Sequence, residues 1–129
     1  MHGVDTDIIV RYLIGDDPAQ AAKARAVIGH KPVFVPRTVL LEAEWVLRGV
    51  YDLPSRQIIP ALRALAGLPG VAVEDAALVA KAMDWAEAGM DFADAVHLAA
   101  AGECEGFLTF DTRLARSGKR LSGIPITAP

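Results

Sequence analysis

Short apolar runs that favour β-strands alternate along this chain with longer segments of helical character. The β-favouring runs cover residues 2–4, 33–35, 71–73, 107–110 and 124–126. Strands separated by helices pair in parallel, because each helix returns the chain to the end of the sheet at which the previous strand began. We therefore expect an α/β fold with three layers, α/β/α, around a central and mostly parallel sheet.

Start and stop signals place helices between these strands. A helix should follow Asp5, and Asp17 and Pro18 should begin the next one, over residues 19–28, which Gly29 ends. Further helices are expected from Pro36 to about residue 51, over 55–66, from 74 to about 88, and from near residue 91.

Bulk properties limit the class of protein. With 129 residues and one cysteine, the chain is expected to form a single domain, residues 1–129, without disulfides. Acids precede any hydrophobic leader and no apolar run could span a bilayer, so we expect a cytoplasmic protein with no membrane partner. The net charge of −3 gives no overall attraction to nucleic acid. The hydrophobic fraction of 53% leaves room for an apolar patch that binds a partner.

Four carboxylates lie inside or beside apolar stretches, with no lysine or arginine in their immediate apolar surroundings: Asp5, Glu42, Asp94 and Asp111. A carboxylate in such surroundings is rarely buried without a partner. A divalent cation held by converging oxygens is the simplest partner that all four could share, and Mg²⁺ or Mn²⁺ suits an all-oxygen site.

Each acid also has a structural interpretation. Asp5 and Asp111 follow predicted strands, where ligand sites collect, but aspartate is also a favoured helix N-cap, and the two roles are compatible. Glu42 shares a helix stripe with apolar residues, which favours a functional role. Its neighbour Glu44 is expected to form a solvent-facing pair with Arg48.

Other polar residues adjoin these acids in sequence. Asp91 lies one turn before Asp94 and is expected to cap that helix or to support the site from outside. Thr6 and Thr109 could orient a carboxylate or a water, although both suit a turn or strand. His97 is expected to be a hydrogen-bonded core residue rather than a metal ligand.

The acids occur without a nucleophile motif, a phosphate-binding glycine loop or a dinucleotide fingerprint. Paired metal ions can activate water and stabilise the leaving oxygen in phosphodiester hydrolysis. A basic group follows the last acid and either contacts an RNA backbone or forms a solvated helix: Arg113, Arg116, Lys119 and Arg120. Arg11, Arg37 and Arg48 are weaker candidates for such contacts.

Four segments, VDTDIIVRYL, VLLEAEWVLRGVYDL, DFADAVHLAAA and FLTFDTRLAR, resemble in order and spacing the acidic motifs of PIN-domain proteins, above all the VapC-type toxins of type II toxin–antitoxin systems. The resemblance implies a compact α/β/α fold and an Mg²⁺- or Mn²⁺-dependent ribonuclease. It also implies a homodimer and a VapB-like antitoxin that covers the active-site groove. The acidic quartet of that family corresponds to Asp5, Glu42, Asp94 and Asp111.

One position departs from the family pattern. Asp7 stands where these toxins usually have asparagine, which adds negative charge near the expected site. One alternative is therefore a PIN-like binding module with little or no activity. A second is a phosphatase of the haloacid dehalogenase type, which would use Asp5 as nucleophile but would need a later lysine; Lys81 is the only one between residues 32 and 118.

Overall fold

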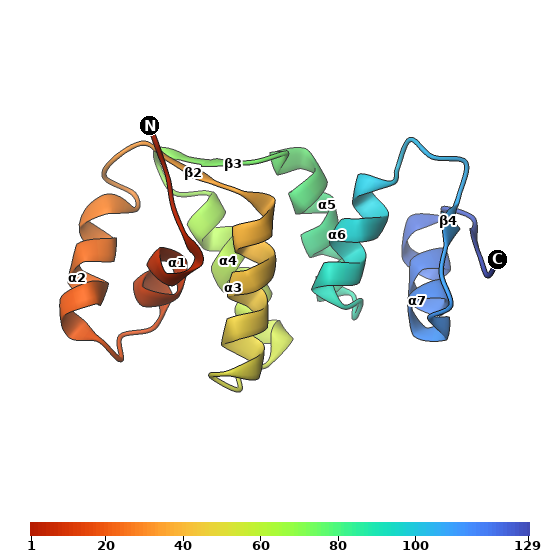
Figure 1. Ribbon diagram of the computed structural model, residues 1–129, viewed down its shortest axis with the longest axis horizontal. Helices are drawn as coiled ribbons and strands as arrows, with labels where there is room; N and C mark the ends of the chain where they lie inside the picture. The colour runs from red at the N-terminus through yellow and green to blue at the C-terminus, as the bar shows by residue number, and fades with distance from the viewer. The chain divides into compact units, whose positions relative to one another are not determined.

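The computed structural model describes every residue from 1 to 129 and divides into two compact units, Met1–Ala76 and Ala77–Pro129. Each unit combines helices with parallel strands (Figure 1). None of the seven helices has both the length and the apolar character needed to cross a membrane.

Unit 1 contains a three-stranded parallel sheet in the order β1-β2-β3. Its elements are β1 (His2–Gly3), α1 (Thr6–Leu13), α2 (Pro18–Val27), β2 (Val33–Val35), α3 (Arg37–Gly49), α4 (Ser55–Ala66) and β3 (Val71–Val73). The register pairs Val33 of β2 with His2 on one side and with Val71 on the other. Helix α1 lies between α2 and α3 and packs against both (Figure 1).

The core of unit 1 comes from the apolar stripes of its helices and from β2. Ile9, Val35, Leu40 and Leu62 are each at most 1% exposed. Their helical spacing places the apolar side chains of α1, α3 and α4 on one face each, and burying those faces drives the packing. This packing fixes α1 against α3, the two helices that carry the acids of this unit.

Unit 2 contains three helices and a pair of parallel strands. Its elements are α5 (Ala76–Glu87), α6 (Phe92–Ala100), β4 (Phe107–Leu108), α7 (Thr112–Ser122) and β5 (Ile126–Thr127). Helix α7 packs closely on its neighbours at Gly118, where an added Cβ would collide with Ile126 and lie 3.0 Å from Leu98 Cδ2. A glycine at this point therefore lets α7 approach both α6 and β5.

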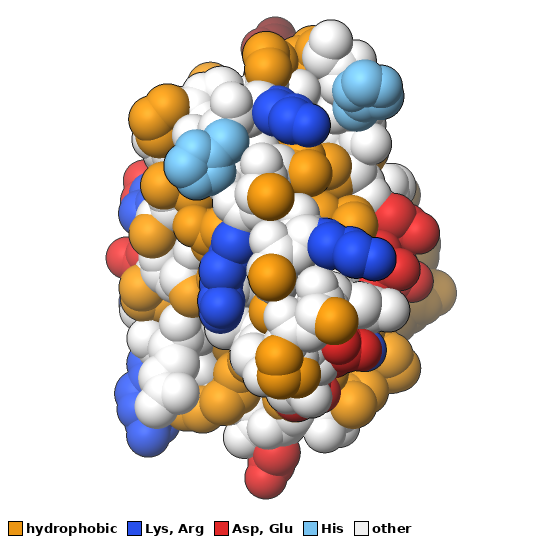
Figure 2. All heavy atoms as spheres, turned by 90° about the vertical axis from the view of Figure 1, so that its left-hand side faces the viewer, with side chains coloured by type: hydrophobic (Ala, Val, Ile, Leu, Met, Phe, Trp, Pro, Cys, Tyr) orange, Lys and Arg blue, Asp and Glu red, His pale blue; other side chains and the backbone are white.

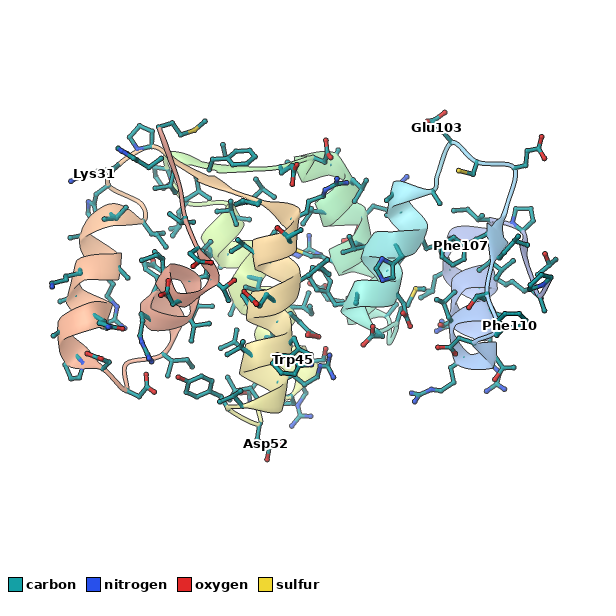
Figure 3. The ribbon with its side chains drawn as sticks, in the orientation of Figure 1. Lys31, Trp45, Asp52, Glu103, Phe107 and Phe110 are labelled. Atoms are coloured by element: carbon teal, nitrogen blue, oxygen red, sulfur yellow. The ribbon has the colours of Figure 1, made fainter.

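The structure confirms the α/β class, the helix–strand alternation and the parallel pairing. The strands form two sheets, one in each unit. The expected strand over residues 107–110 is shorter than predicted, since β4 ends at Leu108. Leu108 and Phe110 are 67% and 83% exposed, and Phe110, which Figure 3 labels together with Phe107 of β4, lies beyond the end of the strand, so the apolar run was a poor guide to the strand's extent.

The prediction that Glu44 faces solvent is wrong. Glu44 is buried in α3, at 3% exposure, although it pairs with Arg48 as expected, with Arg48 Nε 3.0 Å from Oε1. The i, i+4 spacing of the pair is the same on a buried face as on an exposed one, so spacing alone did not reveal which face it occupies.

Candidate functional site

Asp5 occupies the junction between β1 and α1. It has an extended backbone and caps the helix, accepting a hydrogen bond of 2.7 Å from the backbone N–H of Thr6. Aspartate is suited to this place because its short side chain reaches the unpaired N–H groups of a first turn. Asp5 therefore caps α1 as expected, and its exposed side chain also lines the pocket that contains Glu42.

Glu42 of α3 is joined to α1 through Thr6. The buried Thr6 hydroxyl donates a hydrogen bond to Glu42 Oε1. Oε2 of Glu42 makes no hydrogen bond or ion pair, and the side chain is exposed. The prediction that Thr6 orients a site carboxylate is consistent with this contact, which turns one oxygen of Glu42 toward α1 and leaves the other available.

A pocket of about 310 Å³ brings the acids of unit 1 together. Its lining includes Asp5, Asp7 and Glu42, from two helices that pack against each other. Asp7 lies in the first turn of α1, where a negative charge is favoured by the helix dipole. Asp5 and Glu42, which lie far apart in the sequence, thus supply carboxylates to one concave surface.

Asp94 lies in the first turn of α6 in unit 2, half-buried, and Asp91 caps this helix by accepting a hydrogen bond of 3.1 Å from the Asp94 N–H. Burial raises the pKa of Asp94, and the negative charges of Asp91 and Asp111 raise it further. His97 and Arg113 oppose the increase in this pKa. His97 is exposed, so the expectation of a core histidine is wrong.

Asp111 caps α7. Its carboxylate accepts hydrogen bonds from the N–H groups of Arg113 at 2.9 Å and of Leu114 at 3.0 Å. The hydroxyl of Thr109 accepts a hydrogen bond of 3.0 Å from the Asp111 N–H. Thr109 therefore positions the backbone of Asp111 rather than its carboxylate.

Two substitutions at this cap should separate its structural role from a role of its charge. Asp111→Ala is expected to lower the unfolding free energy by about 1 kcal/mol, because two N–H groups lose their acceptor. Asp111→Asn should cost only a few tenths of that, since asparagine caps almost as well. Urea unfolding of both variants measures the difference. Equal losses for alanine and asparagine would show that the carboxylate charge, and not the cap, stabilises α7.

The acids fall into two groups, one in each unit: Asp5, Asp7 and Glu42, and Asp91, Asp94 and Asp111. No set of three or more Asp, Glu, His or Cys side chains converges closely enough to form a complete metal site. All the candidate donors are carboxylate oxygens, which are the hard ligands that Mg²⁺ and Mn²⁺ prefer. Among them, Oε2 of Glu42 makes no hydrogen bond, and Glu42 lines the same pocket as Asp5.

The basic residues after Asp111 are all exposed on α7. Arg113, Arg116 and Arg120 share one stripe of the helix, and Arg120 donates a hydrogen bond of 3.3 Å to the carbonyl of Ala88. Their contact with RNA stays a prediction.

Sequence reasoning did not anticipate a polar network around Arg11. Its guanidinium bonds to Asp16 and Tyr51, and the Tyr51 hydroxyl donates a hydrogen bond of 2.9 Å to Asp16 Oδ2. The bond with Tyr51 contributes most to raising the pKa of Arg11 and to lowering that of Asp16. An arginine within the apolar run IIVRYLIG was the available signal.

These features define an α/β protein with carboxylates at the starts of helices that follow parallel strands. The profile of the PIN domain family matches residues 4–120. The chain therefore belongs to the PIN-domain family, whose members are typically metal-dependent nucleases. The match covers residues of both units and all four predicted site acids. No curated protein matched the chain.

Proposed function

We propose that this protein is a metal-dependent endoribonuclease that hydrolyses phosphodiester bonds. The observation that carries the proposal is the pocket of unit 1, which Asp5 and Glu42 both line. Thr6, the residue after Asp5, donates a hydrogen bond to Glu42, and the chain belongs to the PIN-domain family. Neither Asp5 nor Glu42 forms an ion pair with a basic side chain, and carboxylates that are not neutralised in this way suit metal binding better than acid–base catalysis.

The proposed metal ligands are Asp5, Glu42, Asp94 and Asp111. Bound Mg²⁺ or Mn²⁺ would supply Lewis-acid activation of water and stabilise negative charge on the phosphate. The chain's own residues would orient the ligands: Thr6 holds Glu42, while the helix starts of α1 and α7 fix Asp5 and Asp111. Asp7 adds a further carboxylate beside Asp5, and Asp91 holds the first turn of α6.

We further propose that the chain forms a single PIN domain that acts as a VapC-type toxin, as a homodimer controlled by a VapB-like antitoxin. The sequence motifs and the family match over residues 4–120 support this assignment. Exposed apolar side chains suit such partners: Trp45 is 60% and Val50 65% exposed on α3 and at its end, and Figure 3 shows Trp45 projecting from that helix.

The first experiment is cleavage of a mixed RNA pool with Mn²⁺, Mg²⁺ or EDTA, with Glu42→Gln and Asp94→Asn alongside. Wild type should cut only with metal, and each variant should be slower by roughly a hundredfold or more, because one ligand to a catalytic ion is worth several kcal/mol of transition-state stabilisation. Asp52→Asn is the matched control, since this exposed acid lies outside the pocket.

Equal cutting by all four proteins would indicate a contaminating nuclease and remove the support for this function. RNA binding without cleavage by any of them would favour an inactive PIN-like binding module. Hydrolysis of a small phosphomonoester would favour the phosphatase. Lys81, which the phosphatase would require, is exposed in the middle of α5.

A further inference from the structure

Arg11 of α1 is a partly exposed arginine whose guanidinium forms hydrogen bonds with three other side chains. Its Nε donates a hydrogen bond of 2.9 Å to Gln20 Oε1, and its Nη1 donates to Asp16 Oδ1 at 2.8 Å and to the Tyr51 hydroxyl at 3.2 Å. These partners come from α2, from the segment before it and from the segment after α3, on both sides of α1 in Figure 1. The side chain is 28% exposed, so it is fixed in place but reachable.

One amino group of this guanidinium has no partner. Nη2 of Arg11 makes no hydrogen bond or ion pair, whereas Nε and Nη1 are both engaged. The other two arginines that sequence analysis grouped with Arg11 are paired differently. Arg37 bonds to Glu74 and Asp75, and Arg48 bonds to the buried Glu44.

Arg11 also lies where two cavities meet. It is the only lysine or arginine in the lining of the acidic pocket that contains Asp5, Asp7 and Glu42. It also lines a cavity of about 550 Å³ between α1, α2 and β1, together with Lys23 and Lys31. Figure 2 shows the side of unit 1 on which α2 lies, where Lys and Arg side chains are spread among apolar ones.

This placement suits contact with a phosphate. The acids of the pocket repel a phosphodiester, and a fixed cation beside them offsets part of that repulsion. A guanidinium with a spare N–H can donate a charge-assisted hydrogen bond to a phosphate oxygen, and little side-chain entropy is lost because its partners already hold it. Lys23 and Lys31, which line the second cavity together with Arg11, add further positive charge there.

We propose that Arg11 contacts a backbone phosphate of the RNA strand beside Asp5 and Glu42 and so positions the strand for cleavage. The inference rests on the proposed nuclease function and names a residue that binds the substrate. Contact with a phosphate carries no base information, so its effect should be the same for every RNA sequence.

The test compares wild type, Arg11→Gln and Arg25→Gln. Arg25 is an exposed arginine of α2 that lines neither cavity, so the control makes the same change of charge on the same unit. Binding of a short single-stranded RNA of mixed sequence is measured by fluorescence anisotropy over a series of salt concentrations. Ca²⁺ replaces Mg²⁺, and a gel verifies that the RNA stays intact.

Arg11→Gln is expected to weaken binding on the order of tenfold and to reduce the slope of log K against log salt by about 0.7, the value for one phosphate contact on a single strand. Arg25→Gln should leave both quantities unchanged. In cleavage with Mn²⁺, Arg11→Gln should raise KM more than it lowers kcat. Wild-type affinity and slope in Arg11→Gln would overturn the inference.

Asp16→Asn separates this role from a purely structural one. Asparagine can still accept the hydrogen bond from Arg11, but it removes a negative charge beside the guanidinium, so RNA should bind as tightly as to wild type or more tightly. A structural role predicts the opposite, a loss of binding that parallels a loss of melting temperature in both Asp16→Asn and Arg11→Gln. If wild type cuts RNA with metal and Arg11→Gln has the same KM as wild type, this inference fails and the proposed nuclease function stands. If wild type neither binds nor cuts RNA, the proposed function fails as well.

Discussion

In EDTA at pH 7, Asp94→Asn should melt at the same temperature as wild type or at a higher one. Burial and the charges of Asp91 and Asp111 raise the pKa of Asp94 above its ordinary value of 3.8. The folded protein therefore binds this proton more tightly than the unfolded chain, and ionising the group costs stability. Asparagine has nearly the same shape and carries no charge, so it removes that cost.

The pH dependence has a definite sign. Because the pKa of Asp94 is raised on folding, its contribution to stability is fully present below about pH 3.8 and is lost as the pH rises through the higher folded-state pKa. The melting temperature of Asp94→Asn minus that of wild type should consequently shrink as the pH falls from 7 toward 4. A difference that grows toward low pH would contradict the raised pKa.

Metal should reverse the order of stability. A ligand that binds only the folded protein stabilises it by RT ln(1 + [L]/Kd), which is about 2.7 kcal/mol at a hundredfold excess over Kd and corresponds to roughly 10 °C for a domain of this size. Mn²⁺ should give wild type and the Asp52→Asn control this increase in melting temperature, and Asp94→Asn should lose most of it. The same increase in all three proteins would place the metal elsewhere.

Arg48→Ala should lower the unfolding free energy by about 2–3 kcal/mol, the largest loss of stability that we expect from one surface-accessible side chain. The substitution leaves the Glu44 carboxylate, at 3% exposure, without its ion-pair partner. Breaking a fully buried pair costs about 3–5 kcal/mol, and the smaller value applies because the Arg48 side chain is 45% exposed and partly screened by water.

A double-mutant cycle identifies the cause of that loss. Glu44→Met alone should be neutral or slightly stabilising, since an apolar side chain fills the same buried space without a charge. The double variant Glu44→Met with Arg48→Ala should recover most of the stability that Arg48→Ala loses. Urea unfolding measures all three, with Arg56→Ala on the exposed face of α4 as control. An Arg48→Ala variant within 0.5 kcal/mol of wild type would contradict the argument.

Local signals predicted the helices and their caps well. Asp5 and Asp111 each follow a short strand and precede a helix, and each caps its helix, as its position in the sequence indicated. Asp5 and Glu42 line one pocket of unit 1 although they lie far apart in the sequence. The stripe expected to hold Glu42 is not the buried face of α3, because Glu42 is exposed and the buried face carries Leu40, Ala43, Glu44 and Leu47. The metal-ligand role of all four acids stays a prediction.

Features that depend on tertiary packing were not accessible from the sequence. Glu44 and Arg48 have the spacing of an ordinary surface pair, and only the packing of α3 shows that the carboxylate is buried. The network of Arg11 joins three segments, with Asp16 and Tyr51 lying 35 residues apart; the arginine within an apolar run marked one member, but no local pattern identified its partners. The early end of β4 likewise depends on which residues find a partner strand.

The division of the acids between the two units has a consequence during synthesis. The ribosome synthesises Asp5 and Glu42 as part of unit 1, and it adds Asp94 and Asp111 later as part of unit 2. At roughly 5–20 residues per second, several seconds separate the first of these acids from the last. A nascent chain therefore lacks two of the four proposed ligands until residue 94 is added and lacks the last one until residue 111 is added, so a message broken before the codon for Asp111 cannot encode the full proposed ligand set.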